Sequence, residues 1–212
     1  MTIRLPALLL AAVSIVSGCT SSRPPEPVGA YSVSRDADGS LRVQVGEDVN
    51  AETLMAAVQA AATLAAWEAP ERADGLELQG SDYRGPGVGI IYDYGWDVPG
   101  ARFQAFVYSL PDDAPAQFQG TLDALGVLQT RGTIGSFGVA QALQTRRIPW
   151  GDGDAALHHA VLRETTSGTA YRSYFYLVEA GKHWVKVRAT APEAEVDDEA
   201  VDALVLGLLA QD

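Results

Sequence analysis

Three β-strand patterns near the C-terminus constrain the fold more than any other feature of this 212-residue sequence. They span residues 156–165, 169–180 and 182–190, and each is rich in the β-branched and aromatic residues that strands favour. The turn residues Ser167-Gly168 and Gly181 lie between them, and connections this short are typical of antiparallel hairpins. The sequence therefore predicts an antiparallel meander of three neighbouring strands.

Two elements are predicted near the start of the folded part. Residues 31–45 alternate apolar and polar positions around an Asp-Gly turn, which indicates a hairpin. Residues 50–69 are rich in alanine and end at Pro70, which predicts a helix. The helix face expected to pack against a sheet carries Leu54, Val58, Ala62 and Ala65.

The middle of the chain is less clearly patterned. Residues 87–96 and 101–110 predict two paired strands joined through Pro99-Gly100. Residues 115–128 predict a second helix, and residues 131–148 match no element.

A helix is predicted at the C-terminus. Thr190-Ala191-Pro192-Glu193 has the form of a capping box, and apolar residues follow four apart at Val196, Ala200, Leu204 and Leu208. The sum is an α+β domain with a single antiparallel sheet of about five to seven strands and two or three helices on one face. This order, a sheet meander closed by a C-terminal helix, is similar to that of PsbP-like and Mog1-like domains, although no sequence motif accompanies the likeness.

The N-terminus carries a short apolar run. Residues 1–18 contain one charge, Arg4, and an apolar stretch shorter than the ~20 residues that span a bilayer. This composition is typical of a secretory signal peptide. Val16-Ser17-Gly18-Cys19, which ends the run, resembles the lipobox of bacterial lipoproteins. The resemblance covers only about the first twenty residues, and it implies cleavage before Cys19 and acylation of the cysteine. An ordinary secretory signal followed by an incidental cysteine is the alternative.

The resemblance divides the chain into three parts. These are a signal peptide (1–18), a lipidated cysteine with a proline- and serine-rich tether (19–30) and a single globular α+β domain (31–212). Acylated Cys19 implies attachment to the lipid bilayer and therefore a place in the bacterial cell envelope. Thr20 stands where an aspartate would favour the inner membrane, so the outer membrane is preferred.

The charge is strongly acidic but unevenly distributed. The formal net charge is −12, which disfavours nucleic acid as a partner. Residues 131–188 nevertheless contain eight Lys or Arg against four acids, so the meander region is locally basic.

The sequence predicts no catalytic residues, no metal site and no cofactor. Cys19 is the only cysteine, and no Gly-x-Ser-x-Gly or Ser-x-x-Lys motif is present. His158 and His159 are adjacent in a strand and should point to opposite faces, while His183 is expected two strands away. A zinc site, which needs three or four convergent ligands, is therefore not predicted.

One group of side chains in the meander suggests ligand binding. If one sheet face gathered them, aromatic platforms and basic donors would suit a sugar or an anion. The group consists of Arg172, Tyr174, Tyr176, Trp184, Lys186 and Arg188. The competing interpretation is an exposed sheet face on which such side chains simply pair across strands.

We therefore expect a non-enzymatic envelope lipoprotein that binds or scaffolds another component. Candidate partners are an envelope glycan, an anionic ligand or another envelope protein. The alternative is an envelope hydrolase acting on a cell-wall substrate, for which a close carboxylate pair in a cleft would be the signature.

Overall fold

The computed structural model describes residues 2–5, 31–35, 41–45, 50–84, 89–109 and 112–210. The lipobox with Cys19 and the predicted tether lie outside these ranges, as does most of the glycine-rich segment 85–89. No helix within the described ranges has the length and apolarity needed to cross a membrane.

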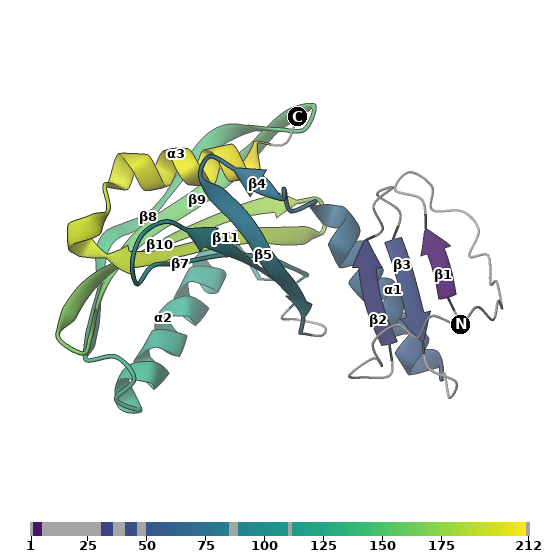
Figure 1. Cartoon of the computed structure of the whole chain (residues 1–212), viewed down its shortest axis with the longest axis horizontal. Coiled ribbons are helices and arrows are strands. Elements are labelled where there is room, and N and C mark those ends of the chain that lie inside the picture. The colour runs from purple at the N-terminus through teal and green to yellow at the C-terminus, as the bar shows by residue number, and fades with distance from the viewer. Residues whose placement is uncertain are drawn as a thin grey trace.

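The main body is one antiparallel sheet of eight strands, in the order β4-β5-β6-β7-β11-β10-β9-β8 (Figure 1). The α+β class is confirmed, but the expected five to seven strands were too few. The strands are β4 (Arg72–Ala73), β5 (Leu76–Tyr83), β6 (Ile90–Trp96), β7 (Arg102–Tyr108), β8 (Ser136–Trp150), β9 (Gly153–Thr166), β10 (Thr169–Ala180) and β11 (His183–Pro192). The predicted meander is β9-β10-β11, and the predicted strand pair is β6-β7.

Helices cover both faces of the sheet, which corrects the prediction of helices on one face. α2 (Ala114–Thr130) lies below the sheet in Figure 1 and α3 (Asp198–Leu209) lies above it. The cause is visible in β10, where six consecutive residues from Ser173 to Val178 are buried. Phe175 and Leu177 pack in a cluster with α2, whereas Tyr174, Tyr176 and Val178 belong to the larger core that includes α3. A strand buried on both sides needs a cover on both sides.

The N-terminal part adds a small second sheet, in the order β1-β3-β2. The predicted hairpin is β2 (Tyr31–Arg35) paired with β3 (Leu41–Val45), and the backbone of β1 (Thr2–Leu5) pairs with the other edge of β3. β1 lies within the predicted signal peptide, so cleavage before Cys19 would remove it and leave β3 an edge strand.

α1 (Ala51–Ala66) packs with a different face from the one predicted. It begins at Asn50, whose side-chain oxygen accepts a hydrogen bond from the Thr53 amide at 2.8 Å. The buried residues are Ala57, Ala60, Ala61, Thr63 and Leu64, while the predicted face, Leu54, Val58, Ala62 and Ala65, is exposed. Alanine occupies so much of this helix that the apolar pattern does not define a single phase.

The C-terminal helix begins later than predicted. Thr190 lies in β11, where its hydroxyl is hydrogen-bonded to that of Ser173 at 2.9 Å, so it caps nothing. A short 3-10 helix, η1 (Glu193–Glu195), follows, and α3 is capped by Asp197, which accepts from the Ala200 amide at 3.3 Å. The buried face carries Val201, Val205, Leu208 and Leu209, and of the predicted stripe only Leu208 is fully buried.

Candidate functional site

The structure divides the six predicted ligand-binding residues between the two faces of the sheet. In the β10-β11 pair, Tyr174 lies opposite Ala189 and Phe175 opposite Arg188. Even-numbered residues of β10 therefore share a face with odd-numbered residues of β11. Arg172, Tyr174 and Tyr176 face α3, and Trp184, Lys186 and Arg188 face α2. The six do not form one surface.

The signal for this register was present in the turn. Gly181 and Lys182 form a two-residue connection, so Ala180 pairs with His183 and every later pair follows. Gly181 has a φ of 64°, which is the conformation that such turns require and glycine adopts without strain.

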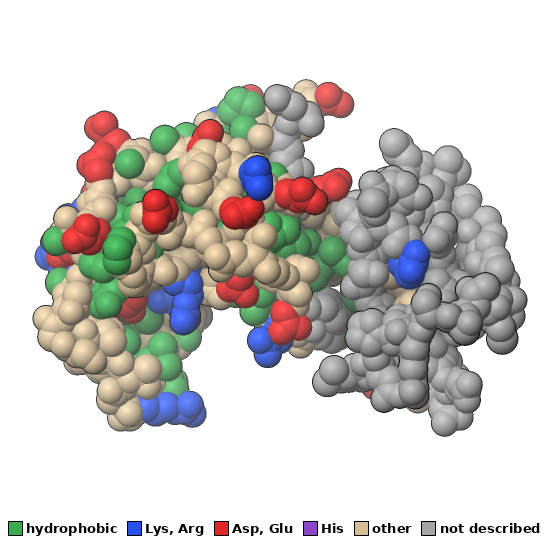
Figure 2. All heavy atoms as spheres, viewed as in Figure 1, with side chains coloured by type: hydrophobic (Ala, Val, Ile, Leu, Met, Phe, Trp, Pro, Cys, Tyr) green, Lys and Arg blue, Asp and Glu red, His purple; other side chains and the backbone are tan. Residues whose placement is uncertain are grey.

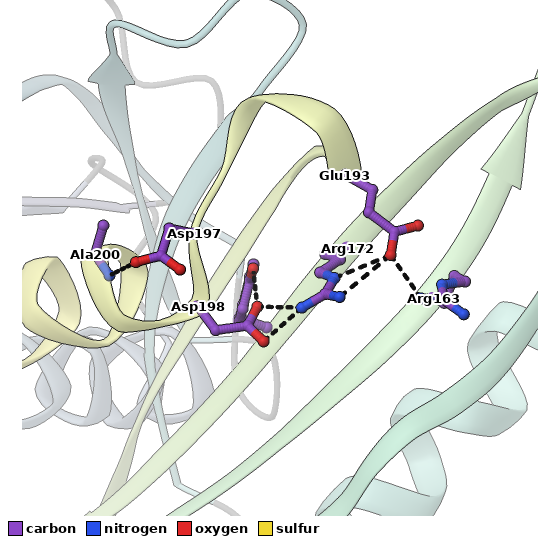
Figure 3. Close-up of polar contacts among 7 residues, drawn as sticks. Arg163, Arg172, Glu193, Asp197, Asp198 and Ala200 are labelled. Atoms are coloured by element: carbon purple, nitrogen blue, oxygen red, sulfur yellow. Dashed lines mark hydrogen bonds and ion pairs between the residues drawn. The ribbon is translucent and has the colours of Figure 1, made fainter.

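On the α3 face, the basic side chains are already neutralised (Figure 3). The Arg172 guanidinium donates to Asp198 at 2.5 Å and to Glu193 at 3.2 Å, and Arg163 donates to the same Glu193 oxygen at 2.6 Å. The Tyr174 hydroxyl donates to Asp198 at 2.6 Å. The network joins β9 and β10 to η1 and the first turn of α3.

The acids of this network are held in their charged forms. Hydrogen bonds from Arg163, and then from Arg172, lower the pKa of Glu193. For Asp198, desolvation opposes ionisation, but hydrogen bonds from Tyr174 and Arg172 outweigh it and lower the pKa. Tyr174 and Tyr176 are buried, with only 1% and 4% of their surface exposed. Arg172, Tyr174 and Tyr176 therefore secure the helix to the sheet and leave little surface for a ligand.

On the α2 face, Trp184 is also part of the packing. It lies in a cluster with Tyr108, Phe175 and Leu177 beneath the start of α2. Its ring centroid is 6.4 Å from that of His158. Trp184 is 9% exposed, so it supports the start of α2 and leaves little surface for a ligand.

Lys186, the next residue on this face, is partly exposed and has aromatic neighbours in place of an acid. Its Nζ atom lies 4.8 Å from the ring centroid of Phe106 and 5.6 Å from that of Tyr108. Among the described residues, no carboxylate pairs with it. Burial, together with the nearby positive charge of Arg188, lowers the pKa of Lys186 to about 8.

Arg188 borders a hollow between the sheet and the second half of α2. The cavity measures about 430 Å³ and is also lined by Arg102, Gln104, Glu164 and Tyr171. The Arg188 Nε atom donates to the Ser173 hydroxyl at 3.1 Å, and Nη2 lies 3.7 Å from Glu164. Burial lowers the pKa of Arg188, Glu164 opposes the shift, and Arg102 adds to it.

The lining of this cavity contains two arginines, Arg102 and Arg188, and one carboxylate, Glu164. Arg102, Lys186 and Arg188 make one ion pair among the described residues, the long contact from Arg188 to Glu164. Asp93 lies on the neighbouring strand, and its carboxylate accepts a hydrogen bond from Gln104 at 2.6 Å. Figure 2 shows acidic side chains gathered above the sheet around α3 and β4, and basic side chains below the sheet beside α2. We name Arg102, Gln104, Glu164 and Arg188, which line the cavity, the basic hollow.

Three of these residues were not among the predicted site residues: Arg102, Gln104 and Glu164. They come from β7 and β9, and only the strand order β7-β11-β10-β9 brings them together. Of the six predicted residues, Arg188 is the one that lines the cavity, and Lys186 lies two residues away on the same face of β11.

A second opening lies at the N-terminal end of α2. It measures about 570 Å³ and is lined by His158, His183, Glu179 and Asp112, among others. His158 and His183 thus border one opening, although they come from strands separated by β10, whereas His159 points to the other face and stacks on Tyr176 at 6.0 Å. Burial lowers the pKa of all three histidines. No group of three or more metal-ligating side chains occurs within the described ranges.

The comparisons with known proteins leave the family open. No family model and no curated protein sequence matches the chain. Cyanobacterial PsbP (CyanoP) from Synechocystis sp. PCC 6803 is similar in structure with a TM-score of 0.46 and 10% identity, covering 88% of this chain and 96% of that one. A Pseudomonas aeruginosa protein of unknown function is similar with a TM-score of 0.41 and 12% identity, covering 87% and 99%. Both TM-scores lie below 0.5, and we draw no conclusion from either.

Proposed function

We propose that this chain is a lipoprotein of the bacterial cell envelope whose domain binds a small anionic ligand in the basic hollow. The observation that supports the binding proposal is the pair of arginines, Arg102 and Arg188, that line the cavity against a single carboxylate, the buried Glu164. In a chain of net charge −12, a concave site with more basic than acidic side chains indicates an anionic partner.

The size and chemistry of the hollow suit a small ligand. Its 430 Å³ falls within the ~300–1,000 Å³ of ordinary ligand sites. Arg102 and Arg188 supply planar guanidinium donors that match a carboxylate or a phosphate group. The surrounding acidic surface repels large polyanions, so a small anion is favoured over an extended acidic polymer.

The support for a lipid anchor at Cys19 comes from the sequence alone. Val16-Ser17-Gly18-Cys19 follows an apolar run in the position of a lipobox, and a diacylated or triacylated Cys19 would supply the more than one acyl chain that stable attachment needs. Ten residues, 20–29, extend to no more than ~35 Å, so the domain would stay close to its bilayer. Thr20 again favours the outer membrane.

The hydrolase alternative gains no support from the geometry. Two facing carboxylates are needed for glycoside hydrolysis. Among the described residues, Glu164 is the one buried carboxylate, and its nearest charged neighbour is Arg188.

Equilibrium dialysis of the purified protein with radiolabelled inorganic phosphate and with glucuronate tests the binding proposal. We expect saturable binding that weakens as sodium chloride rises. Arg102→Ser should bind at least ~5-fold more weakly, because it removes an exposed guanidinium donor that makes no ion pair with the described residues. Arg72→Ser is the matched control, since Arg72 is an exposed arginine paired with Glu77 at the far end of the sheet. Equal affinities for the parent and Arg102→Ser would refute a site in the basic hollow.

A further inference from the structure

One side of α1 is both apolar and exposed. Leu54, Met55 and Val58 are 38%, 58% and 48% exposed, and they are three of the five large hydrophobic side chains that are exposed within the described ranges. Exposed alanines continue the same side of the helix in both directions, at the spacing of a single helix face. We name these six residues the α1 stripe: Ala51, Leu54, Met55, Val58, Ala62 and Ala65. A contiguous apolar surface of this kind marks an interaction site with a protein or a membrane.

The α1 stripe is uncharged, and the rest of the helix is almost so. The single charged residue of α1 is Glu52, and the helix contains no Lys or Arg. Helices that bind a bilayer by electrostatic attraction carry such basic residues on their polar face. In a chain of net charge −12, a contact made by α1 must therefore come from the burial of apolar surface and not from attraction to anionic head groups.

The α1 stripe is too small to hold two copies of the chain together by itself. From Ala51 to Ala65 the helix rises about 21 Å, and a strip about 10 Å wide along it covers roughly 200 Å². A stable protein–protein interface takes ~800 Å² from each partner. A contact with a bilayer needs no such area when an acyl chain already holds the protein at the membrane, because the second contact is then intramolecular in effect.

The end of the tether places α1 near the proposed anchor. Tyr31, the first residue after the tether, begins β2 and packs against the core cluster that also contains Ala57 and Ala61 of α1. Figure 1 shows β2, β3 and α1 together on the right of the molecule, beside the main sheet. The helix is about 24 Å long and the tether extends to no more than ~35 Å, so an acylated Cys19 would keep the α1 stripe within reach of the bilayer.

We propose that the α1 stripe docks on the lipid bilayer that holds Cys19, with α1 lying along the membrane surface. This inference rests on the lipid anchor of the proposed function and adds a second contact with the membrane. Leu54, Met55 and Val58 enter the boundary between the head groups and the acyl chains, as the apolar faces of interfacial helices do. The acylated cysteine keeps the domain near the bilayer, and the α1 stripe determines which side of the domain meets the lipid.

Fluorescence quenching by lipids tests the proposal on the acylated protein. The protein is purified from host membranes and reconstituted into phosphatidylcholine vesicles, with and without phosphatidylcholine that carries a nitroxide on its acyl chain. A thiol-reactive fluorophore is attached at Val58→Cys or, as the matched control, at Val127→Cys, since Val127 is a 49% exposed valine of helix α2. Acylated Cys19 leaves no other thiol to react. We expect the nitroxide lipid to quench the Val58→Cys probe at least ~3-fold more strongly than the Val127→Cys probe.

A charge placed within the α1 stripe should remove the contact. Ala62→Glu, added to the Val58→Cys protein, puts a carboxylate one turn along the stripe and should lower the quenching to the level at Val127→Cys, because a charged group is costly in the apolar boundary. Gln59→Glu adds the same charge at an exposed position outside the stripe and should leave the quenching unchanged. Positions 59 and 62 are both exposed, so both variants should fold. Raising sodium chloride should also leave the quenching at Val58→Cys unchanged, because no basic side chain of α1 takes part.

The outcomes separate this inference from the proposed anchor. Equal quenching at Val58→Cys and Val127→Cys, whether strong or absent, would overturn the docking and leave the anchor standing. If the unlabelled Val58→Cys protein also formed disulfide-linked dimers in the vesicles, a second copy of the chain would be the occupant of the α1 stripe. Reaction of the fluorophore with the parent would reveal a free thiol at Cys19, and it would overturn both the anchor and the docking that depends on it.

Discussion

At the scale of single residues, burial and pairing distinguish cations that hold the fold from cations available to a ligand. Arg172 lies between two carboxylates and bonds to both. On the other face, Arg188 makes one long contact with Glu164, and Lys186 makes no ion pair with the described residues. Within each strand, the alternation of residues predicted which side chains share a face. Which face of β10 matches which face of β11 depends on the register set by the turn between them.

Replacing Arg172 by alanine should destabilise the protein. Asp198, at the start of α3, would lose its guanidinium partner and keep only the Tyr174 hydroxyl, and charge-assisted hydrogen bonds contribute about 1.5–3 kcal/mol when well shielded. The pair is partly exposed, so we expect a loss of about 1–2 kcal/mol in the free energy of unfolding, measured with urea. Arg72→Ala, which breaks an exposed pair, should change it by less than about 0.5 kcal/mol.

The difference in unfolding free energy between the parent and Arg172→Ala should depend on pH. The folded-state pKa of Asp198 is lowered, so its contribution is present above the unfolded value of 3.8 and is lost as pH falls through the folded pKa. The gap in unfolding free energy between the parent and Arg172→Ala should therefore be constant near neutral pH and shrink below about pH 4. A gap that persists unchanged to pH 2 would show that the network does not act through the ionised carboxylate.

At the scale of elements, the sequence predicted strands with strong alternation and missed those without it. The meander β9-β10-β11 was predicted because its strands are long and have glycine in the connections. β8 was missed because it is an edge strand, mostly exposed, with irregular pairing between Val139 and Gln144. Edge strands need no regular apolar face, so the period-two pattern is weak there. For α1 the helix was predicted but its phase was wrong, because alanine occurs on every side.

One substitution at two positions tests the phase of α1. Ala57 has no exposed surface, whereas Ala62 lies on the exposed face. Ala57→Leu should reduce the free energy of unfolding by about 1–3 kcal/mol through overpacking. Ala62→Leu keeps the helix propensity nearly unchanged and should change the free energy of unfolding by less than about 0.5 kcal/mol. If Ala62→Leu were the more damaging of the two in urea denaturation, the face predicted from the sequence would be the packed one.

At the scale of the whole molecule, the two faces of the sheet differ in packing and in charge. The α3 face holds the core, and its buried surface is closed by a neutralised ionic network. The α2 face borders a cavity lined by two arginines, of which Arg102 makes no ion pair with the described residues. The locally basic meander was visible in the sequence, but its placement beside Arg102 depends on the crossover that puts β11 next to β7.

The anchor is tested at the same scale by Cys19→Ser. In the bacterial host, a palmitate analogue should label the parent and give no signal above background in the variant, because the proposed lipidation uses the only cysteine in the chain. The variant should also appear in the soluble fraction after cell lysis. Equal labelling of both proteins would contradict the lipobox assignment.

The most direct test of the central claim, that the basic hollow binds a small anion, is the thermal unfolding midpoint as inorganic phosphate is raised at constant ionic strength. A ligand that binds only the folded state raises the midpoint in proportion to the logarithm of its concentration once the site is saturated. The parent and Arg163→Ser, which alters the α3 face, should both show this rise, and in Arg102→Ser the rise should begin only at an at least ~5-fold higher phosphate concentration. A rise of the same size in Arg102→Ser, or no rise in the parent, would contradict the claim.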